Sequence, residues 1–149
     1  MRDNEWLEEK MYEIWEGHFS DIPRKNLVII KFGRGSKRQL GSIKWANKKT
    51  RGIRQFLKGR DLQDDKRVSV ITITSKFKDE EIPEKIVLAT IAHEMCHYAH
   101  GFNSPLKQIF NHPHKGGVIR KEMEKRGLKH LYKFSKKWLK ENWKEYVID

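Results

Sequence analysis

Hydrophobic residues recur along this chain at two spacings, one typical of helices and one typical of strands. Residues 4–19 carry large apolar side chains at helical spacing, which predicts an amphipathic helix with Asn4 as its N-cap. The sequence VSVITIT at 68–74 alternates Val or Ile with Ser or Thr, as half-buried strands do. Shorter apolar runs predict strands at 26–32 and 40–46. The first half of the chain is therefore predicted to hold one helix and three strands.

The segment EKIVLATIAHEMCHYAH at 84–100 is apolar almost all round, so we expect a buried helix. Two further helices are predicted at 115–126 and 129–146. Together these elements predict one α+β domain, in which a small, mostly antiparallel sheet packs on the N-terminal helix and the buried helix. We expect the strand at 68–74 to form an exposed sheet edge that borders a cleft and can pair with an extended polypeptide.

Charge is distributed unevenly along the 149 residues, which carry 32 Lys and Arg against 20 Asp and Glu, a formal net charge of +12. Residues 24–67 hold 15 basic and 3 acidic side chains, and residues 101–149 hold 12 and 5. Two interpretations remain open: a charged, solvated surface, or a surface that binds a polyanion such as nucleic acid. The polar stretch 47–67 within the first basic block fits a loop or an insertion.

Several absences in the sequence indicate an intracellular protein, in the cytoplasm, nucleoid or nucleus. No apolar run approaches the ~18 residues that span a bilayer, and no apolar segment typical of a signal peptide follows the first residues. Cys96 is the only cysteine, so an internal disulfide is excluded, which fits a reducing compartment. We therefore expect no membrane partner.

The buried helix carries His93-Glu94-Met95-Cys96-His97, an H-E-x-x-H motif. Residues four apart on a helix differ by about 40° in direction and one turn in height, so both imidazoles can bind one metal ion. Glu94 lies about 100° from His93, where it can hold a metal-bound water. Zinc lowers the pKa of such a water towards neutrality, and a carboxylate can accept its proton. The motif thus predicts one Zn²⁺ per chain and a metallopeptidase with Glu94 as the general base.

A catalytic zinc site of this kind has three protein ligands, so a third must come from elsewhere in the chain. His114 is favoured because it directly precedes a predicted helix and is followed by glycines that let the backbone approach closely. His112 is the nearest alternative, and His100, two turns beyond His93, is expected at the surface. The full set of downstream candidates is His100, His112, His114, His130, Glu122 and Glu124.

This order of motifs resembles the SprT-like zinc metalloprotease domain, the catalytic domain of Spartan-type proteases. The resemblance covers roughly residues 5–130 and rests on the strand VSVITITSKF, the helix LATIAHEMCHYAHG and the later HKGGVIRKEME. In the family, a later histidine usually sits in an H-G-x-x-F pattern. Here His114 matches the histidine, Gly116 stands one place later than the usual glycine, and Val118 or Ile119 replaces the aromatic residue.

The resemblance implies a compact zincin-like domain over 1–149, with a C-terminal helix at about 129–146. It also implies an endopeptidase that cleaves proteins bound or crosslinked to DNA and is stimulated by DNA. Two other hypotheses fit the same residues. One is a general-purpose zincin peptidase that is not coupled to DNA, in either an active form or a latent, self-inhibited form. The other is a basic DNA-binding protein whose zinc site is not catalytic.

Candidate nucleic-acid contacts lie in the two basic blocks. A tryptophan in the first block could stack on an exposed base, which would favour single-stranded DNA, and lysines of the last helix could follow phosphates. A core tryptophan and a solvated helix face are the alternatives. The candidates are Trp45, Lys44, Lys48, Lys49, Arg51, Arg54, Lys136, Lys137 and Lys140.

Three other side chains have a structural and a chemical interpretation. Cys96 fits a small buried hydrophobe better than a metal ligand. Either Tyr98 or Tyr132 could stabilise an oxyanion, and the sequence does not choose between them.

Overall fold

The structure is a computed structural model that describes residues 1–47, 50 and 67–147. Its elements are α1 (Asn4–His18), β1 (Val28–Phe32), β2 (Gly41–Trp45), β3 (Ser69–Ile73), the 3₁₀ turn η2 (Ser75–Lys78), α3 (Glu84–Ala99), the 3₁₀ turn η3 (Lys115–Gly117), α4 (Val118–Lys125) and α5 (Lys129–Val147). Each predicted strand, and the helices predicted at 4–19, 84–100 and 129–146, occur within two residues of their expected places. The helix predicted at 115–126 begins three residues late, at Val118, because residues 115–117 form the 3₁₀ turn η3. Most of the stretch 47–67, expected to be a loop or an insertion, lies outside the described residues.

The three described strands form one mixed sheet in the order β1-β3-β2. β1 runs parallel to β3, and β2 runs antiparallel to it. The expectation of a mostly antiparallel sheet is therefore wrong, and so is the expectation that residues 68–74 form its edge. Four of the five β3 residues are buried, which suits a central strand that is covered on both faces. The edge position beside α3 belongs to β2.

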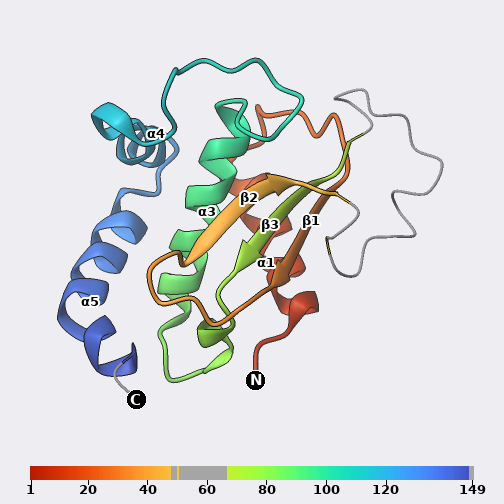
Figure 1. Ribbon diagram of the computed structural model, residues 1–149. Helices are drawn as coiled ribbons and strands as arrows, with labels where there is room; N and C mark the ends of the chain where they lie inside the picture. The colour runs from red at the N-terminus through yellow and green to blue at the C-terminus, as the bar shows by residue number, and fades with distance from the viewer. Residues whose placement is uncertain (48–49, 51–66, 148–149) are drawn as a thin grey trace.

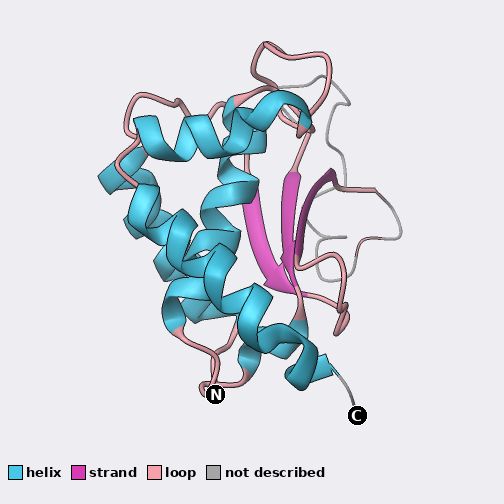
Figure 2. Cartoon of the chain, turned by 90° about the vertical axis from the view of Figure 1, so that its left-hand side faces the viewer, coloured by secondary structure: helices cyan, strands magenta, loops and turns pink. Residues whose placement is uncertain are grey.

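Helices α1 and α3 cover one face of the sheet, and α5 packs on the outer side of α3 (Figures 1 and 2). The core between these layers contains Leu7 and Met11 of α1, Ile71 and Ile73 of β3, and apolar side chains of α3. The structure therefore confirms an α+β fold whose sheet packs on the N-terminal and buried helices. No helix in the described part of the chain is long and apolar enough to cross a membrane.

The start of α1 differs from the prediction by one residue. Asp3, not Asn4, is the N-cap, and its side chain accepts a hydrogen bond from the backbone N–H of Trp6 at 2.8 Å. The side chain of Asn4 instead accepts from the backbone N–H of Phe32 at 2.9 Å. Asn4 therefore ties α1 to β1, a contact between distant residues that local capping patterns do not reveal.

Candidate metal centre and cleft

Two helical residues and one loop residue bring three imidazoles together. His93 and His97 lie four apart on α3, and His114 directly precedes η3. The chain can fold back over α3 at this point because Gly116 and Gly117 both have positive φ angles, 77° and 69°, which glycine adopts readily. The glycines therefore serve the site through their backbone conformation. The expectation that they permit a close backbone approach is wrong for Gly116, where an added Cβ atom would meet no atom within 4 Å.

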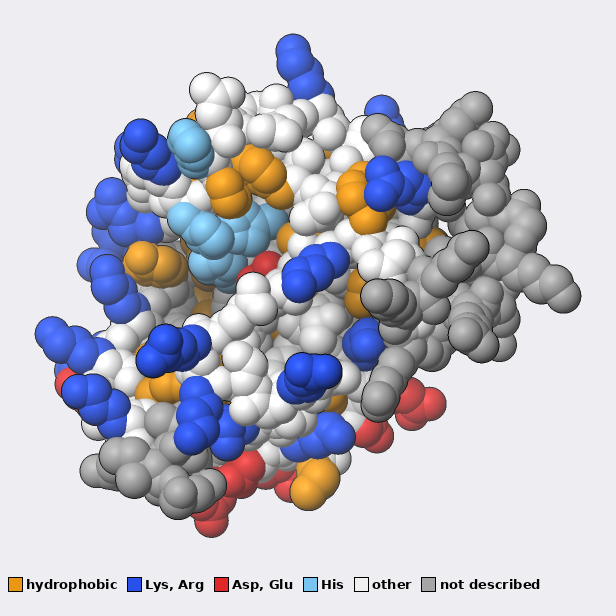
Figure 3. Space-filling view, in the orientation of Figure 1, with side chains coloured by type: hydrophobic (Ala, Val, Ile, Leu, Met, Phe, Trp, Pro, Cys, Tyr) orange, Lys and Arg blue, Asp and Glu red, His pale blue; other side chains and the backbone are white. Residues whose placement is uncertain are grey.

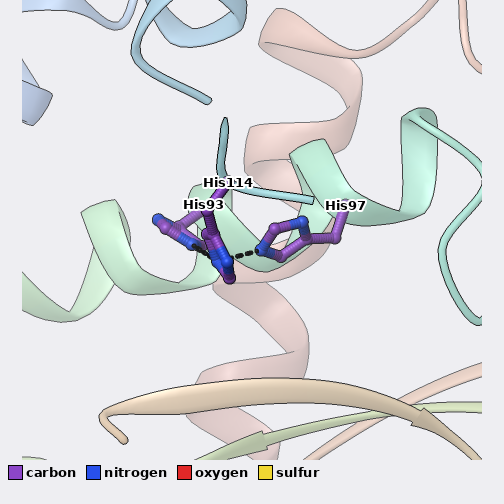
Figure 4. Close-up of side chains that lie close together, drawn as sticks. All are labelled: His93, His97 and His114. Atoms are coloured by element: carbon purple, nitrogen blue, oxygen red, sulfur yellow. Dashed lines mark hydrogen bonds between the residues drawn. The ribbon is translucent and has the colours of Figure 1, made fainter. Parts of the chain in front are cut away.

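The three imidazoles point their Nε2 atoms at one another (Figure 4). The Nε2 atom of His114 lies 3.3 Å from that of His93 and 2.9 Å from that of His97. The candidate ligand atoms of all three residues lie within 4.8 Å of one another. Three nitrogens bound tetrahedrally at zinc's bond length of about 2.05 Å would be separated by about 3.3 Å. His93, His97 and His114, called the metal group below, could therefore hold a metal ion with little movement of their side chains.

Burial keeps two of these imidazoles in the form that binds metals. Burial first, and the neighbouring imidazoles second, lower the pKa of His93 to about 4 and that of His97 to about 3. At neutral pH both rings are uncharged, so each has a nitrogen lone pair available for a cation. Nδ1 of His97 is buried and has no hydrogen-bond partner in the described structure. The ring's polar contact is therefore made by Nε2, which faces Nε2 of His114.

Glu94 lies in the same cleft as the three histidines and is only 5% exposed. This burial raises the pKa of its carboxyl to about 8. Gly41, the first residue of β2, leaves room for the carboxylate. A Cβ atom there would lie 2.9 Å from Cγ2 of Thr90 and 3.1 Å from Oε2 of Glu94. The sequence indicated a role for Glu94, but only the structure shows that Gly41 accommodates it.

The cleft has a volume of about 760 Å³ and is open to solvent. Residues 38–44 form one wall, α3 forms the floor, and Tyr132, Ser135, Lys136 and Leu139 of α5 form the opposite wall. Figure 3 shows histidine side chains gathered in a hollow of the surface, with lysine and arginine side chains on both sides. A chain segment could therefore enter between β2 and α5 and reach the histidines.

β2 is an edge strand, and the backbone groups on its outer side form hydrogen bonds to no other strand among the described residues. Thr74 donates to the carbonyl of Leu40 and Ala46 donates to that of Val68, both at 2.8 Å. The even-numbered residues thus bond to β3, and the backbone groups of Gly41 and Ile43 point away from it. The carbonyl of Ile43 already accepts a hydrogen bond from the side chain of Asn103 at 3.0 Å.

The structure separates the two tyrosines that the sequence could not. The hydroxyl of Tyr98 donates to Oδ1 of Asn26 at 2.6 Å, and its ring is 1% exposed in the core. Tyr132 lines the cleft. Cys96 is fully buried outside the metal group, and burial raises the pKa of its thiol, so it acts as a small core residue.

The nucleic-acid candidates fall into three groups in the structure. Lys44 and Lys136 are exposed and lie on opposite walls of the cleft. Lys137 and Lys140 are exposed on α5, outside the cleft. The half-buried ring of Trp45 is covered on one face by the guanidinium of Arg67, 4.2 Å from the ring centre. The remaining candidates, Lys48, Lys49, Arg51 and Arg54, lie outside the described residues.

The other candidate metal ligands lie apart from the metal group. His112, Glu124 and His130 are exposed. His100, expected at the surface, is 1% exposed, and its Nε2 atom lies 2.9 Å from Oε1 of Glu122. The expectation for His100 is therefore wrong, because the α3–α4 connection folds over the end of α3 and covers it. The spacing of residues along α3 could not predict Glu122 as the partner of His100, because Glu122 lies on another helix.

Comparisons of the chain with protein-family models, curated proteins and solved structures find no match. The features of the chain that indicate a function are therefore the metal group, the buried carboxylate and the cleft that contains them.

Proposed function

We propose that this protein is a zinc-dependent endopeptidase of the SprT-like type, which cleaves proteins held on DNA. One observation carries the proposal: three imidazole Nε2 atoms converge in the cleft that also contains the buried Glu94. A structural zinc site normally has four protein ligands, whereas three ligands leave a position open for chemistry. Among the described residues, the metal group contains three.

The donor set supports zinc as the ion. Neutral imidazoles suit zinc and other late transition metals, whereas calcium and magnesium prefer oxygen ligands. Zinc bound to His93, His97 and His114 would act as a Lewis acid, polarising the scissile carbonyl and making water more acidic.

Glu94 is the proposed general base. It accepts the proton of the attacking water and then delivers that proton to the leaving amine. The burial that raises the pKa of its carboxyl to about 8 favours proton uptake, whereas a cation held by the imidazoles favours the ionised form that can act as a base. Tyr132, on the opposite wall of the cleft, is the proposed hydroxyl donor to the developing oxyanion.

The edge strand supports an extended polypeptide as substrate. The backbone groups of Gly41 and the N–H of Ile43 pair with no strand in the part of the chain that the structure describes, so they can pair with a peptide main chain. The carbonyl of Ile43 already accepts a hydrogen bond from Asn103. Main-chain pairing is indifferent to side-chain identity. We therefore expect the enzyme to cleave unstructured segments with limited sequence preference.

The positive charge around the cleft supports DNA as the partner that brings substrate to the enzyme. Lys44 and Lys136 lie on the two walls, and Arg38 lines the cleft beside them. Phosphates held there would place a DNA-bound protein next to the metal group and raise its local concentration.

The experiment measures metal content and then the cleavage of one DNA-binding protein, with and without single-stranded DNA, at low and moderate salt. We expect about one zinc per chain and faster cleavage with DNA, more so at low salt. Lys136→Glu should reduce the DNA effect, whereas Lys129→Glu, an exposed lysine outside the cleft on the same helix, should reduce it less. Equal rates in all conditions would favour a general zincin peptidase. Zinc and DNA binding without cleavage would favour a non-catalytic zinc site.

A further inference from the structure

We propose that His100 is a positioning residue for the metal centre, which holds the chain segment that carries His114. This inference rests on the metal group of the proposed function. His100 follows the last residue of α3, and Glu122 lies on α4, beyond His114 in the chain. Their contact at 2.9 Å therefore joins the two ends of the segment that presents the third imidazole.

His100 also holds the middle of that segment. Its backbone carbonyl accepts a hydrogen bond from the N–H of Ile109 at 3.1 Å. Its ring lies edge-on to the ring of Phe110, with 4.8 Å between their centres. One buried residue thus contacts the connection at Ile109, Phe110 and Glu122, all within eight residues of the metal group's His114 in the chain. Displacing His100 would release the connection on both sides of His114.

The contact between His100 and Glu122 is well defined chemically. The carboxylate of Glu122 only accepts hydrogen bonds, so the ring proton of His100 lies on Nε2. Nδ1 of His100 has no hydrogen-bond partner in the described structure, which leaves Glu122 as the ring's polar anchor. In a side chain that is 1% exposed, losing that anchor would leave a buried polar group unpaired.

Arg126 connects this anchor to the end of α1 and to the turn that follows it. Its Nε donates to Oε2 of Glu122 at 2.7 Å, and its Nη1 donates to Oδ1 of Asp21 at 2.7 Å and to the carbonyl of His18 at 2.9 Å. The guanidinium is planar and presents its donors in fixed directions, so it sets the orientation of α4 against the end of α1. His114 therefore enters the cleft from a segment that is anchored at both ends.

His100 itself takes no direct part in the chemistry. It does not belong to the metal group, and it does not line the cleft. Its effect on a bound metal is therefore indirect, through the position of His114. Residues that orient metal ligands in this way typically change metal affinity by about 10- to 100-fold when they are replaced.

The experiment compares zinc affinity in His100→Ala, His100→Gln, Glu122→Gln and Tyr98→Phe, measured by competition with a chromophoric chelator. Tyr98→Phe is the matched control: it removes the part-buried hydrogen bond from the Tyr98 hydroxyl to Asn26 on the same helix, and it keeps the backbone carbonyl that accepts from Ser104 of the connection. Urea unfolding of the metal-free proteins measures the stability lost in each. Cobalt substitution reports coordination geometry through its visible spectrum.

We expect His100→Ala to weaken zinc binding by about 10- to 100-fold and to shift the cobalt spectrum towards that of His114→Ala. His100→Gln keeps a donor for Glu122 and should recover part of the affinity. Glu122→Gln, which keeps the shape of the side chain, should weaken binding even if His100→Ala does not fold. Tyr98→Phe should lose stability with little change in zinc affinity. Unchanged affinity and spectra in the His100 and Glu122 variants, or an equal loss in Tyr98→Phe, would overturn the inference and leave the proposed function standing. An unmodified protein that binds no zinc would overturn the proposed function as well.

Discussion

Replacing Glu94 with glutamine should stabilise the metal-free protein at alkaline pH, even though it should abolish peptidase activity. The carboxyl is 5% exposed, and burial raises its pKa from 4.5 to about 8. In the unfolded chain the same carboxyl has its ordinary pKa and is ionised above about pH 5. At higher pH, folding must therefore either bind a proton at Glu94 or bury a negative charge. Glutamine has nearly the same shape and avoids both costs.

The magnitude follows from the two pKa values. Because folding raises this pKa, the contribution of Glu94 to stability is fully present below the unfolded pKa and is lost as the pH rises through the folded pKa. Each pH unit between the two values changes the free energy of unfolding by about 1.4 kcal/mol. Relative to Glu94→Gln, the unmodified protein should therefore lose about 2 to 3 kcal/mol of stability between pH 6 and pH 9. His93 and His97 are present in both proteins, so their titration largely cancels in the comparison.

The assay is urea unfolding of both proteins in the presence of a chelator, at pH 6, 7.5 and 9. Glu124→Gln, a change at an exposed carboxyl of α4, is the control and should follow the unmodified protein at every pH. Zinc should reduce the difference in unfolding free energy between Glu94→Gln and the unmodified protein, because a nearby positive charge favours the ionised carboxylate. If the difference in unfolding free energy between the two metal-free proteins stays constant from pH 6 to pH 9, burial does not raise the pKa of the Glu94 carboxyl, and the reasoning is refuted.

Three further predictions concern the site and its partner. His114→Ala should weaken zinc binding far more than His112→Ala in chelator competition, and the reverse order would move the third ligand to His112. Gly41→Ala should lower the cleavage rate about 10-fold or more with zinc content unchanged, because the added Cβ atom would displace Thr90 or the carboxylate of Glu94. Full activity in this variant would show that the Cβ atom does not displace the carboxylate. Affinity for single-stranded DNA should fall with salt at a log–log slope near −0.7 per contacted phosphate, and salt-independent binding would exclude phosphate contacts.

The candidate site was predictable in part because its first elements are local. Two residues four apart share a helix face wherever the helix lies, so His93 and His97 could be paired before the fold was known. The apolar surroundings of the motif also predicted its burial, which the structure confirms for His97 and Glu94. His114 could be favoured, but not assigned, because its approach depends on how the chain returns from the end of α3.

The sequence by itself determined the periodicities: where the helices and strands form, and which α3 side chains share a face. Tertiary structure decided that β3 lies between β1 and β2, because strand order depends on pairing between residues far apart in the chain. It also decided that His100 is buried against Glu122, since that contact forms only when α4 folds back onto the end of α3. Helical spacing is a property of neighbouring residues, whereas the partner of a buried polar group is supplied by whichever distant segment covers it.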